Sequence, residues 1–424
     1  MIPRLTGFAT TGLRLVALAA FLGVISGRSE LLLVAAPIVA VLLSAQVTTR
    51  PPRYTLTHAV SATRLLEGDR LTVTVTLTAE TALPLIELLQ DLPPLIELAS
   101  GERRVTFRLK AGERHQWTSD LRCPARGRFT LGSIHVRIGN RAGVQAFEAS
   151  HLGRTAVAVY PRVAPLRHVP QPLRTQTSVG NYVAAEVGAG LEPGEIRLFA
   201  PGDPVRRVNW RASLRLGKLY VTQYHLERNA DVVLMLDTLS QVGRPPTASL
   251  DMCARAAASL ASAYLARKDR VGLIEYGGTF RWVRPAAGRA QFERLMDALA
   301  AAQPTFTYIR KDLALVPPRI LPARALVIAL SPLLDARFVD AVKDLMARRF
   351  DVVLLSVSPV AVTRAVLKLS PLDDLACRLW AFEHRAQLEA LRRRGLEVLE
   401  WSPADSLELV LAPLAGRRRR VVAA

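Results

Sequence analysis

Three residues with oxygen-bearing side chains stand at or just after the ends of predicted strands, where a sheet could bring them together. Asp237 ends the apolar run DVVLMLD, and Ser331, followed by Asp335, ends a second run, ALVIALS. Parallel strands direct their carboxyl ends to one edge of a sheet, where ligands bind in such folds. Carboxylate and hydroxyl oxygens are the ligands that Mg²⁺ prefers. The pattern therefore predicts either a metal site at these residues or an Asp237 that only caps the loop after its strand.

A basic segment, FAPGDPVRRVNWRASLRLGKLYVTQYH at residues 199–225, is the second concentration of reactive side chains. Its Gly217-Lys218 pair resembles part of a phosphate-binding loop. That motif also needs a glycine at position 212 and a hydroxyl after the lysine, but the chain has Ala212 and Leu219 there. The segment is therefore not a nucleotide-binding loop.

Local signals predict a short helix in this segment. Asp203 and Pro204 are typical of a helix start, and Gly217 is typical of a helix stop. We expect Trp210 to lie between the β-domain and the α/β domain. The residues predicted to form this interdomain or partner-binding surface are Asp203, Arg206, Arg207, Trp210, Arg211 and Lys218.

Catalytic motifs are absent from the sequence. It contains no HExxH, no GxSxG and no paired catalytic carboxylates, and its seven histidines are scattered. We therefore predict no catalytic residues and no enzyme. Two alternatives stay open: a metal-dependent hydrolase or nuclease that uses Asp237 and Asp335, and a nucleic-acid binder that uses the basic segment and the RRRR tail at 417–420. The aromatic residues form no stacking platform, so we expect no nucleic-acid partner.

Alternating strands and helices are predicted to position the three oxygen-bearing residues. From residue 231 onward, short apolar runs alternate with amphipathic segments such as ASLDMCARAAASLASAYLARK at 248–268. This alternation is typical of βαβ units. We therefore predict a doubly wound, Rossmann-like α/β domain at 231–424.

The region before it has a different pattern. RLTVTVTLTAE at 70–80 alternates apolar and polar residues, and several more short segments repeat this pattern between Gly, Pro and Asp turns. Such spacing predicts an antiparallel β-sandwich domain at 51–165. Residues 166–230 are then a linker that carries the short basic helix.

Two apolar segments, at 13–26 and 31–47, open the chain. With the polar GRSE between them they predict a transmembrane helical hairpin at 1–50, and a cleavable signal peptide is the alternative. Positive flanking charge indicates the cytoplasmic side. Both ends carry it, so we expect a plasma (inner) membrane protein with cytoplasmic soluble domains; the flanking residues are Arg4, Arg14, Arg50 and Arg53.

Composition agrees with this arrangement. Half of the residues are hydrophobic, which excludes a disordered chain. The net charge is +20, and only six of the 56 basic residues are lysine, so arginine accounts for the excess. Cys123, Cys253 and Cys377 are far apart and form no CxxC pair, which fits a reducing compartment and excludes a cysteine zinc site.

The longest recognisable pattern is GEIRLFAPGDPVRRVNWRASLRLGKLYVTQYHLERNADVVLMLD, at 194–237. It resembles the signature of the domain of unknown function 58 family. The matching positions are Glu195, Arg197, Phe199, Pro201, Gly202, Asp203, Arg207, Asn209, Trp210, Gly217, Lys218, Leu219, Glu227, Arg228 and Asp237. The upstream CPARGRFTLGSIHVRIGNRAGVQAFE is similar to the end of that family's β-domain. With the two apolar segments, the resemblance covers nearly the whole chain.

The resemblance implies a membrane-anchored adaptor with a β-domain and a von Willebrand factor A-like (vWA-like) domain. Such proteins are commonly encoded beside MoxR-type AAA+ ATPases and transglutaminase-like membrane proteins, so both are implied partners. No catalytic activity is established for the family as a whole.

The vWA-like domain also implies a place for a metal. Its metal site uses D-x-S-x-S, a distant threonine and a later aspartate. Asp237 matches the first position, but Leu239 and Gln241 replace both serines, and Ser331 stands where the later aspartate is expected. The candidates for the threonine are Thr305 and Thr307. The resemblance therefore implies a degenerate Mg²⁺ site at Asp237, Ser331 and Asp335, and no required cofactor.

Overall fold

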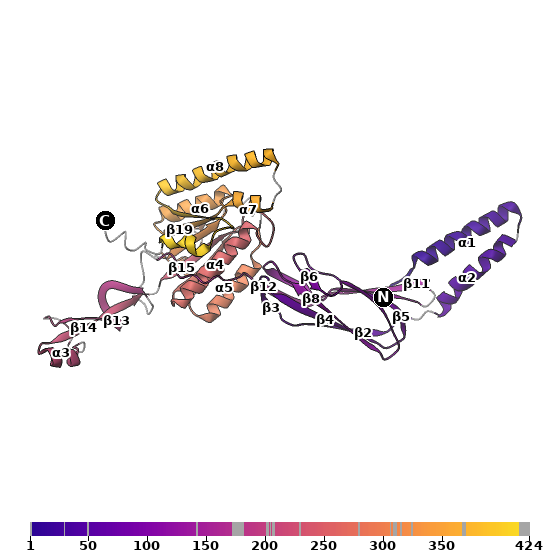
Figure 1. Ribbon diagram of the computed structural model, residues 1–424, viewed down its shortest axis with the longest axis horizontal. Helices are drawn as coiled ribbons and strands as arrows, with labels where there is room; N and C mark the ends of the chain where they lie inside the picture. Colours follow the sequence, from indigo (N-terminus) through magenta and orange to yellow (C-terminus); the bar gives the residue numbers. More distant parts are fainter. Residues whose placement is uncertain are drawn as a thin grey trace. The chain divides into compact units, whose positions relative to one another are not determined.

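The chain forms two compact units, Met1–Val159 and Tyr160–Ala424, in a computed structural model (Figure 1). The boundary lies a few residues before the predicted domain end at 165. The structure describes residues 2–28, 30–48, 51–140, 143–171, 182–200, 203, 205, 208–228, 230–278, 280–305, 307, 312–313, 316–323, 325–366 and 370–414.

The first unit begins with two helices that pack along each other, α1 (Gly7–Ser26) and α2 (Glu30–Thr48) (Figure 1). The helices lie close at Gly12, where a Cβ would be in van der Waals contact with Ile38 at 3.4 Å. In the described part of the chain, α1 is the helix that is long and apolar enough to cross a membrane, although a signal sequence passes the same test. The apolar N-terminus therefore fits membrane anchoring.

A short strand that sequence analysis did not predict precedes α1. β1 (Ile2–Leu5) pairs antiparallel with β11 (Gln145–His151), and Arg4 forms a 3.1 Å ion pair with Glu148. Thr6 then caps α1: its Oγ1 accepts from the Ala9 N–H, and its own N–H donates to the Val144 carbonyl at 3.0 Å. The helical pair is thus tied to the β-sheet through the strand that begins the chain.

The rest of the first unit is antiparallel β-structure, as the alternating pattern predicted. The strand order is β1-β11-β10-β5-β7 in one sheet, β2-β4-β8-β6 in a second and β3-β12-β9 in a third. The strands not yet given are β2 (Tyr54–Val60), β3 (Arg64–Leu66), β4 (Arg70–Ala79), β5 (Leu83–Gln90), β6 (Glu97–Ser100), β7 (Arg104–Leu109), β8 (Arg114–Arg122), β9 (Gly127–Leu131), β10 (Ile134–Gly139) and β12 (Thr155–Tyr160).

One core serves these sheets. Leu71, Val73 and Val75 alternate inward along β4, and they share a buried cluster with Ile86 of β5 and Val136 of β10. The period-two alternation therefore reflects strands that bury one face each.

The second unit contains a six-stranded sheet in the order β17-β16-β15-β18-β19-β20. All neighbours pair in parallel except β17, which pairs antiparallel with β16. The strands are β15 (Asp231–Asp237), β16 (Arg270–Tyr276), β17 (Arg281–Ala286), β18 (Leu326–Ser331), β19 (Asp351–Val357) and β20 (Glu397–Trp401). The helices are α4 (Ser249–Ala266), α5 (Arg289–Ala301), α6 (Ala336–Ala347), α7 (Pro359–Val366), α8 (Pro371–Arg393) and α9 (Leu407–Leu411).

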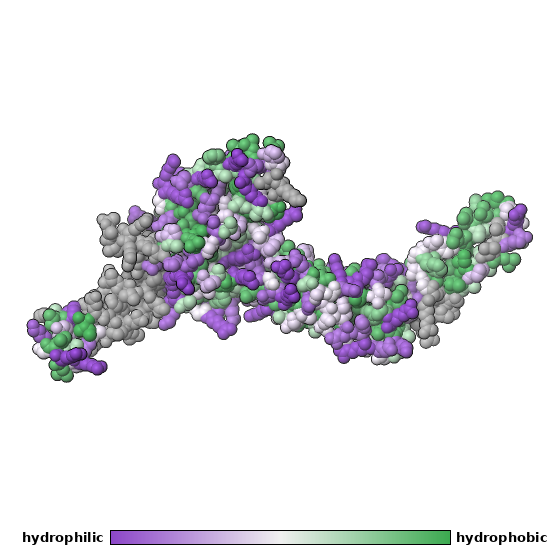
Figure 2. Space-filling view, viewed as in Figure 1, coloured by the Kyte–Doolittle hydropathy of each residue, from purple (hydrophilic) through white to green (hydrophobic). Residues whose placement is uncertain are grey.

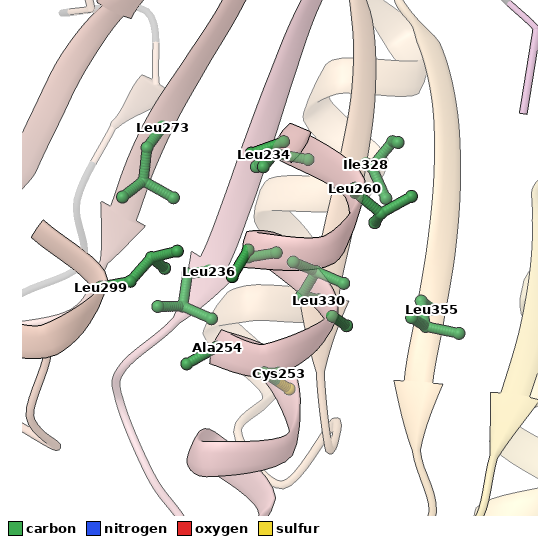
Figure 3. Close-up of a cluster of buried hydrophobic side chains, with 14 of the residues drawn as sticks. Leu234, Leu236, Cys253, Ala254, Leu260, Leu273, Leu299, Ile328, Leu330 and Leu355 are labelled. Atoms are coloured by element: carbon green, nitrogen blue, oxygen red, sulfur yellow. The ribbon is translucent and has the colours of Figure 1, made fainter. Parts of the chain in front are cut away.

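Helices cover both faces of this sheet. Leu234 and Leu236 of β15 face a cluster that includes Leu260 of α4 and Leu299 of α5 (Figure 3). The alternate residues of β15 face the opposite cluster, which includes Phe338 of α6. Because β15 is buried on both faces, its sequence is a continuous apolar run rather than an alternating one.

The beginning of the predicted linker is part of the second unit. Val163, Leu166 and Val169 pack against the cluster that contains α4. The Glu408 carboxylate of α9 accepts hydrogen bonds from the backbone N–H and the side chain of His168. Residues 160–171 therefore extend the α/β core instead of joining two domains as a free linker.

Candidate functional site

The carboxyl edge of the sheet brings Asp237 and Ser331 into contact. Neighbouring parallel strands β15 and β18 end at these two residues. Ser331 Oγ donates to Asp237 Oδ2 at 2.5 Å, and the Leu239 N–H donates to Oδ1 at 3.0 Å. The Leu333 N–H in turn donates to Ser331 Oγ at 2.8 Å. Both Asp237 oxygens are therefore engaged by the loops that follow the two strands.

Burial dominates the electrostatics of Asp237, which is 1% exposed. Loss of solvation raises its pKa to about 7 from 3.8, and the nearby Asp335 charge adds to the rise. The hydrogen bonds from Ser331 and from the Leu239 N–H oppose it, as does the Arg337 charge. Asp237 is therefore protonated in a large fraction of molecules near neutral pH.

Asp335 is held by an arginine that sequence analysis missed. Asp335 caps the N-terminus of α6, where its Oδ1 accepts from the Arg337 N–H at 2.9 Å. The Arg337 guanidinium also donates to both carboxylate oxygens, at 2.9 Å to Oδ1 and 2.6 Å to Oδ2. This pairing lowers the pKa of Asp335. The sequence feature that could have indicated this pair is an arginine two residues after an aspartate at a helix start, a spacing at which the two side chains can meet.

The loops beside this edge form a tight backbone network. The Thr238 N–H donates to the Tyr276 carbonyl at 2.9 Å, and the Thr305 N–H donates to the Thr238 carbonyl at 2.8 Å. The Thr305 hydroxyl donates to the Gln303 carbonyl at 3.2 Å, while the Thr307 carbonyl accepts from Arg337. The Thr305 hydroxyl and the Thr307 carbonyl thus contact protein groups other than Asp237.

The donor set does not fit a divalent cation. Leu239 stands where the resemblance implies a serine ligand, and a guanidinium already occupies both oxygens of Asp335. Arg337 thus supplies at this edge the positive charge that a cation would supply.

We therefore expect no metal binding here. Mg²⁺ or Mn²⁺ titrated calorimetrically into the full chain should give no saturable heat, and Asp237→Ala should give the same trace. Saturable heat in the wild type that Asp237→Ala abolishes would show that the cation displaces Arg337 and would contradict this interpretation.

The basic segment forms an arm. β13 (Tyr182–Leu198) and β14 (Tyr220–Arg228) pair antiparallel, and α3 (Trp210–Leu216) lies between them in the chain (Figure 1). Phe199 and Leu219 continue the pairing, since the Phe199 N–H donates to the Leu219 carbonyl at 2.8 Å. The segment is therefore a β-hairpin with a helical tip.

The tip helix begins later than the sequence predicted. Asn209, not Asp203, is the N-cap of α3, and its Oδ1 accepts from the Ala212 N–H at 3.0 Å. Asp203 instead accepts from both terminal nitrogens of Arg197, at 2.7 and 2.6 Å. This ion pair fixes the turn before the helix, so the predicted start at Asp203 is wrong. The predicted end is confirmed, because Gly217 caps the helix with φ 67°.

Internal bonds make the tip a defined structure. Asn209 Nδ2 donates to Thr222 Oγ1 at 3.1 Å, and the Tyr220 N–H donates to Ser213 Oγ at 2.8 Å. Both bonds tie α3 to β14. Ser213 is buried, whereas the residues around it on the helix are largely exposed.

Large apolar side chains project from this tip into solvent. Leu214 is 84% exposed and Trp210 60%, and Leu216 and Leu219 are exposed as well. Trp210 is therefore exposed within the second unit, and its predicted position between domains stays a prediction. Figure 2 shows hydrophobic and hydrophilic residues interspersed at the end of this arm. The exposed cations beside them are Arg211, Arg215 and Lys218, whereas Arg206 and Arg207 lie outside the described residues.

The fold and the arm together define a class: a β-rich unit with an apolar N-terminus, and a layered α/β unit that carries a basic hairpin arm. Comparison with known families gives one match. Residues 195–361 match the family model described as protein of unknown function DUF58, the family that the signature resembles. The match includes the arm from residue 195 onward and the strands that end at Asp237 and Ser331.

The relatives that the chain resembles are themselves uncharacterised. Uncharacterized protein Rv1480 of Mycobacterium tuberculosis is 29% identical over 138 residues, which cover 32% of this chain and 44% of that protein. Uncharacterized protein YeaD of Bacillus subtilis is 24% identical over 261 residues, which cover 59% of this chain and 64% of that protein. The chain thus aligns with less than two thirds of either relative.

Solved structures add only distant similarity. The cupredoxin domain of amoB from Nitrosocaldus yellowstonii aligns with 25% of this chain and 86% of that one, at 14% identity and a TM-score of 0.19. A similarity this low supports no conclusion about fold or function.

Proposed function

We propose that the chain is a membrane-anchored, non-enzymatic docking protein that acts with a MoxR-type AAA+ ATPase through the tip of its arm. The observation that carries the proposal is the exposed apolar and basic surface of α3, within the family match. Exposed aromatic and aliphatic residues beside cations are typical of interaction surfaces. The ordered tip would present them without a large loss of conformational entropy on binding.

The anchor in this proposal is the pair α1 and α2. α1 has the length and composition of a membrane span, and its apolar side chains are exposed, among them Phe8, Phe21 and Val24. The basic residues at both ends of the helical pair favour a hairpin with its ends, and the soluble units, on the cytoplasmic side.

The α/β unit is, in this proposal, a vWA-like domain whose metal position has been taken over by the Asp335–Arg337 pair. At the carboxyl edge of the sheet the polar side chains are hydrogen-bonded to other protein groups, which supports a scaffold role for the unit rather than a hydrolase or nuclease activity. A hydrolase would need an accessible carboxylate, whereas Asp237 is buried and hydrogen-bonded on both oxygens.

Co-purification from native membranes tests the proposal. Tagged wild-type chain is solubilised in the presence of a non-hydrolysable ATP analogue, which holds the ATPase in its nucleotide-bound state. It is expected to recover the ATPase. The double variant Trp210→Ala, Leu214→Ala should recover at least about 10-fold less, because exposed anchor residues of this kind contribute about 2 kcal/mol or more each at interfaces. Both side chains are exposed, so we expect the fold to be retained.

Leu409→Ala is the matched control, because Leu409 is also largely exposed but lies on α9. It should recover the ATPase as well as the wild type does. Failure of the wild type to recover any ATPase, or equal recovery by the tip variant, would contradict the proposal.

A further inference from the structure

The longest helix of the second unit has an apolar stripe on its outer face. In α8, Leu372 is 75% exposed, Leu375 54%, Leu379 60% and Phe382 70%. Figure 2 shows hydrophobic residues along the upper edge of this unit, where Figure 1 places α8. An outer helix face in a soluble unit is ordinarily polar. These four residues form a surface, the α8 stripe, that nothing in the described chain covers.

The inner face of α8 is a separate surface. Cys377, His384, Leu388 and Leu391 are buried, and the two leucines belong to the core under the sheet. The helix therefore keeps its place in the fold by its inner face. The α8 stripe makes no contribution to that packing and is available to a partner.

The spacing of the stripe is that of a coiled-coil seam. Its members are separated by three, four and three residues, and Ala386 continues the series four residues further on. A repeat of this kind presents apolar residues along one side of a helix and packs against a second helix with the same repeat. From Leu372 to Ala386 the seam spans about 21 Å, at about 1.5 Å per residue.

The charges beside the seam favour a second copy of the helix as the partner. Arg378, which also forms a 2.8 Å ion pair with Asp374 one turn earlier, flanks the stripe on one side, and Glu383 flanks it on the other. In a parallel, in-register pair of α8 helices, each Arg378 faces Glu383 of the other copy, because flanking positions five residues apart meet across such a seam. An antiparallel pair centred on Leu379 would instead set the two Arg378 side chains against each other.

We propose that two copies of this chain associate through a parallel pairing of their α8 stripes. Leu372, Leu375, Leu379 and Phe382 form the seam, and Arg378 of each copy pairs with Glu383 of the other. The interface is two-fold symmetric, so each residue of the seam meets its own counterpart. A seam of about two heptads is short, and we expect a dimer that dissociates on dilution.

Site-specific cross-linking of the purified full chain in detergent tests the proposal. Leu372→Cys and Leu379→Cys should each give a cross-linked dimer with a short bis-maleimide, because a parallel seam places identical positions side by side. The native cysteines are buried. Leu409→Cys is the control for an equally exposed cysteine elsewhere, and it should stay at least about 10-fold less cross-linked.

Charge reversal supplies the second readout. Glu383→Arg should weaken the dimer in sedimentation by setting arginines against each other, and Arg378→Glu combined with Glu383→Arg should restore it. Cross-linking at Leu379→Cys but not at Leu372→Cys would overturn the parallel pairing. Equal cross-linking of Leu409→Cys would overturn it too, as would a Leu379→Glu variant whose oligomeric state in sedimentation is unchanged.

Discussion

Replacing Asp237 with Asn is expected to make the α/β unit progressively more stable than the wild type as pH rises from about 4 to 7. The folded pKa of Asp237, about 7, lies above its ordinary value of 3.8. Across this window the folded state holds a proton that the unfolded state has lost, so wild-type stability falls with rising pH. At about 1.4 kcal/mol per pKa unit, the difference at pH 8 is on the order of 4 kcal/mol.

Hydrogen exchange of peptides from β15 and β18 measures this difference in the full chain. Wild type and variant are compared at the same pH, which cancels the intrinsic pH dependence of exchange. Asp335→Asn is the contrasting control. The pKa of Asp335 is lowered in the fold, so its charge stabilises above the ordinary pKa and that contribution is lost on acidification. A constant gap between wild type and Asp237→Asn from pH 4 to 8 would show that Asp237 is ionised throughout.

The same pKa bears on what the sheet edge does. A pKa of about 7 leaves the Asp237 carboxyl partly protonated near neutral pH, and the charged carboxylate beside it already has a guanidinium. Both observations support the proposal that the residues at this edge stabilise loops and that a partner binds at the exposed tip of the arm.

Periodicity made most of the fold predictable. DVVLMLD and ALVIALS became the central strands β15 and β18 because a run that is apolar at every position fits only a strand buried on both faces. RLTVTVTLTAE became β4 because alternation fits a strand buried on one face. In each case a pattern over a few neighbouring residues shows which faces of the strand are buried.

Features set by distant contacts escaped prediction. β1 is a strand because β11, more than a hundred residues later, pairs with it, and nothing in IPRL alone indicates this. The start of α3 was misplaced because Arg197 takes the Asp203 side chain that would otherwise cap a helix. Asp237 and Ser331 were predicted to share an edge, but Arg337 was missed because its role depends on where α6 begins.

The first half of α8 is hard to predict for a different reason. The amphipathic pattern is clear only from about residue 381 onward, whereas the helix begins at Pro371. Leu372, Leu375 and Leu379 lie opposite the buried face, so this stretch is apolar on two sides and lacks a single amphipathic period. Apolar residues on the outer face of a helix therefore mask the amphipathic period from which the helix would be predicted.

Gly277→Ala is expected to destabilise the α/β unit by about 3 kcal/mol, the upper range for overpacking a core. A Cβ at this position would lie 2.1 Å from Thr238 Oγ1 and 3.0 Å from the Thr238 carbonyl oxygen. That carbonyl accepts from Thr305, and the Thr238 N–H donates to Tyr276, so the backbone cannot retreat without losing these bonds. Hydrogen exchange in β15 and β16 measures the loss.

A double variant separates the steric conflict from a general loss of packing. Thr238→Ala alone should cost about 1 kcal/mol, but in the Gly277→Ala background it should recover part of the stability, because it removes the atom closest to the new methyl group. Recovery would show that the loops after β15 and β16 are packed to contact next to Asp237. Additive losses would instead mean that the Thr238 hydroxyl is not what the new methyl group meets, and the steric explanation of Gly277 would fail.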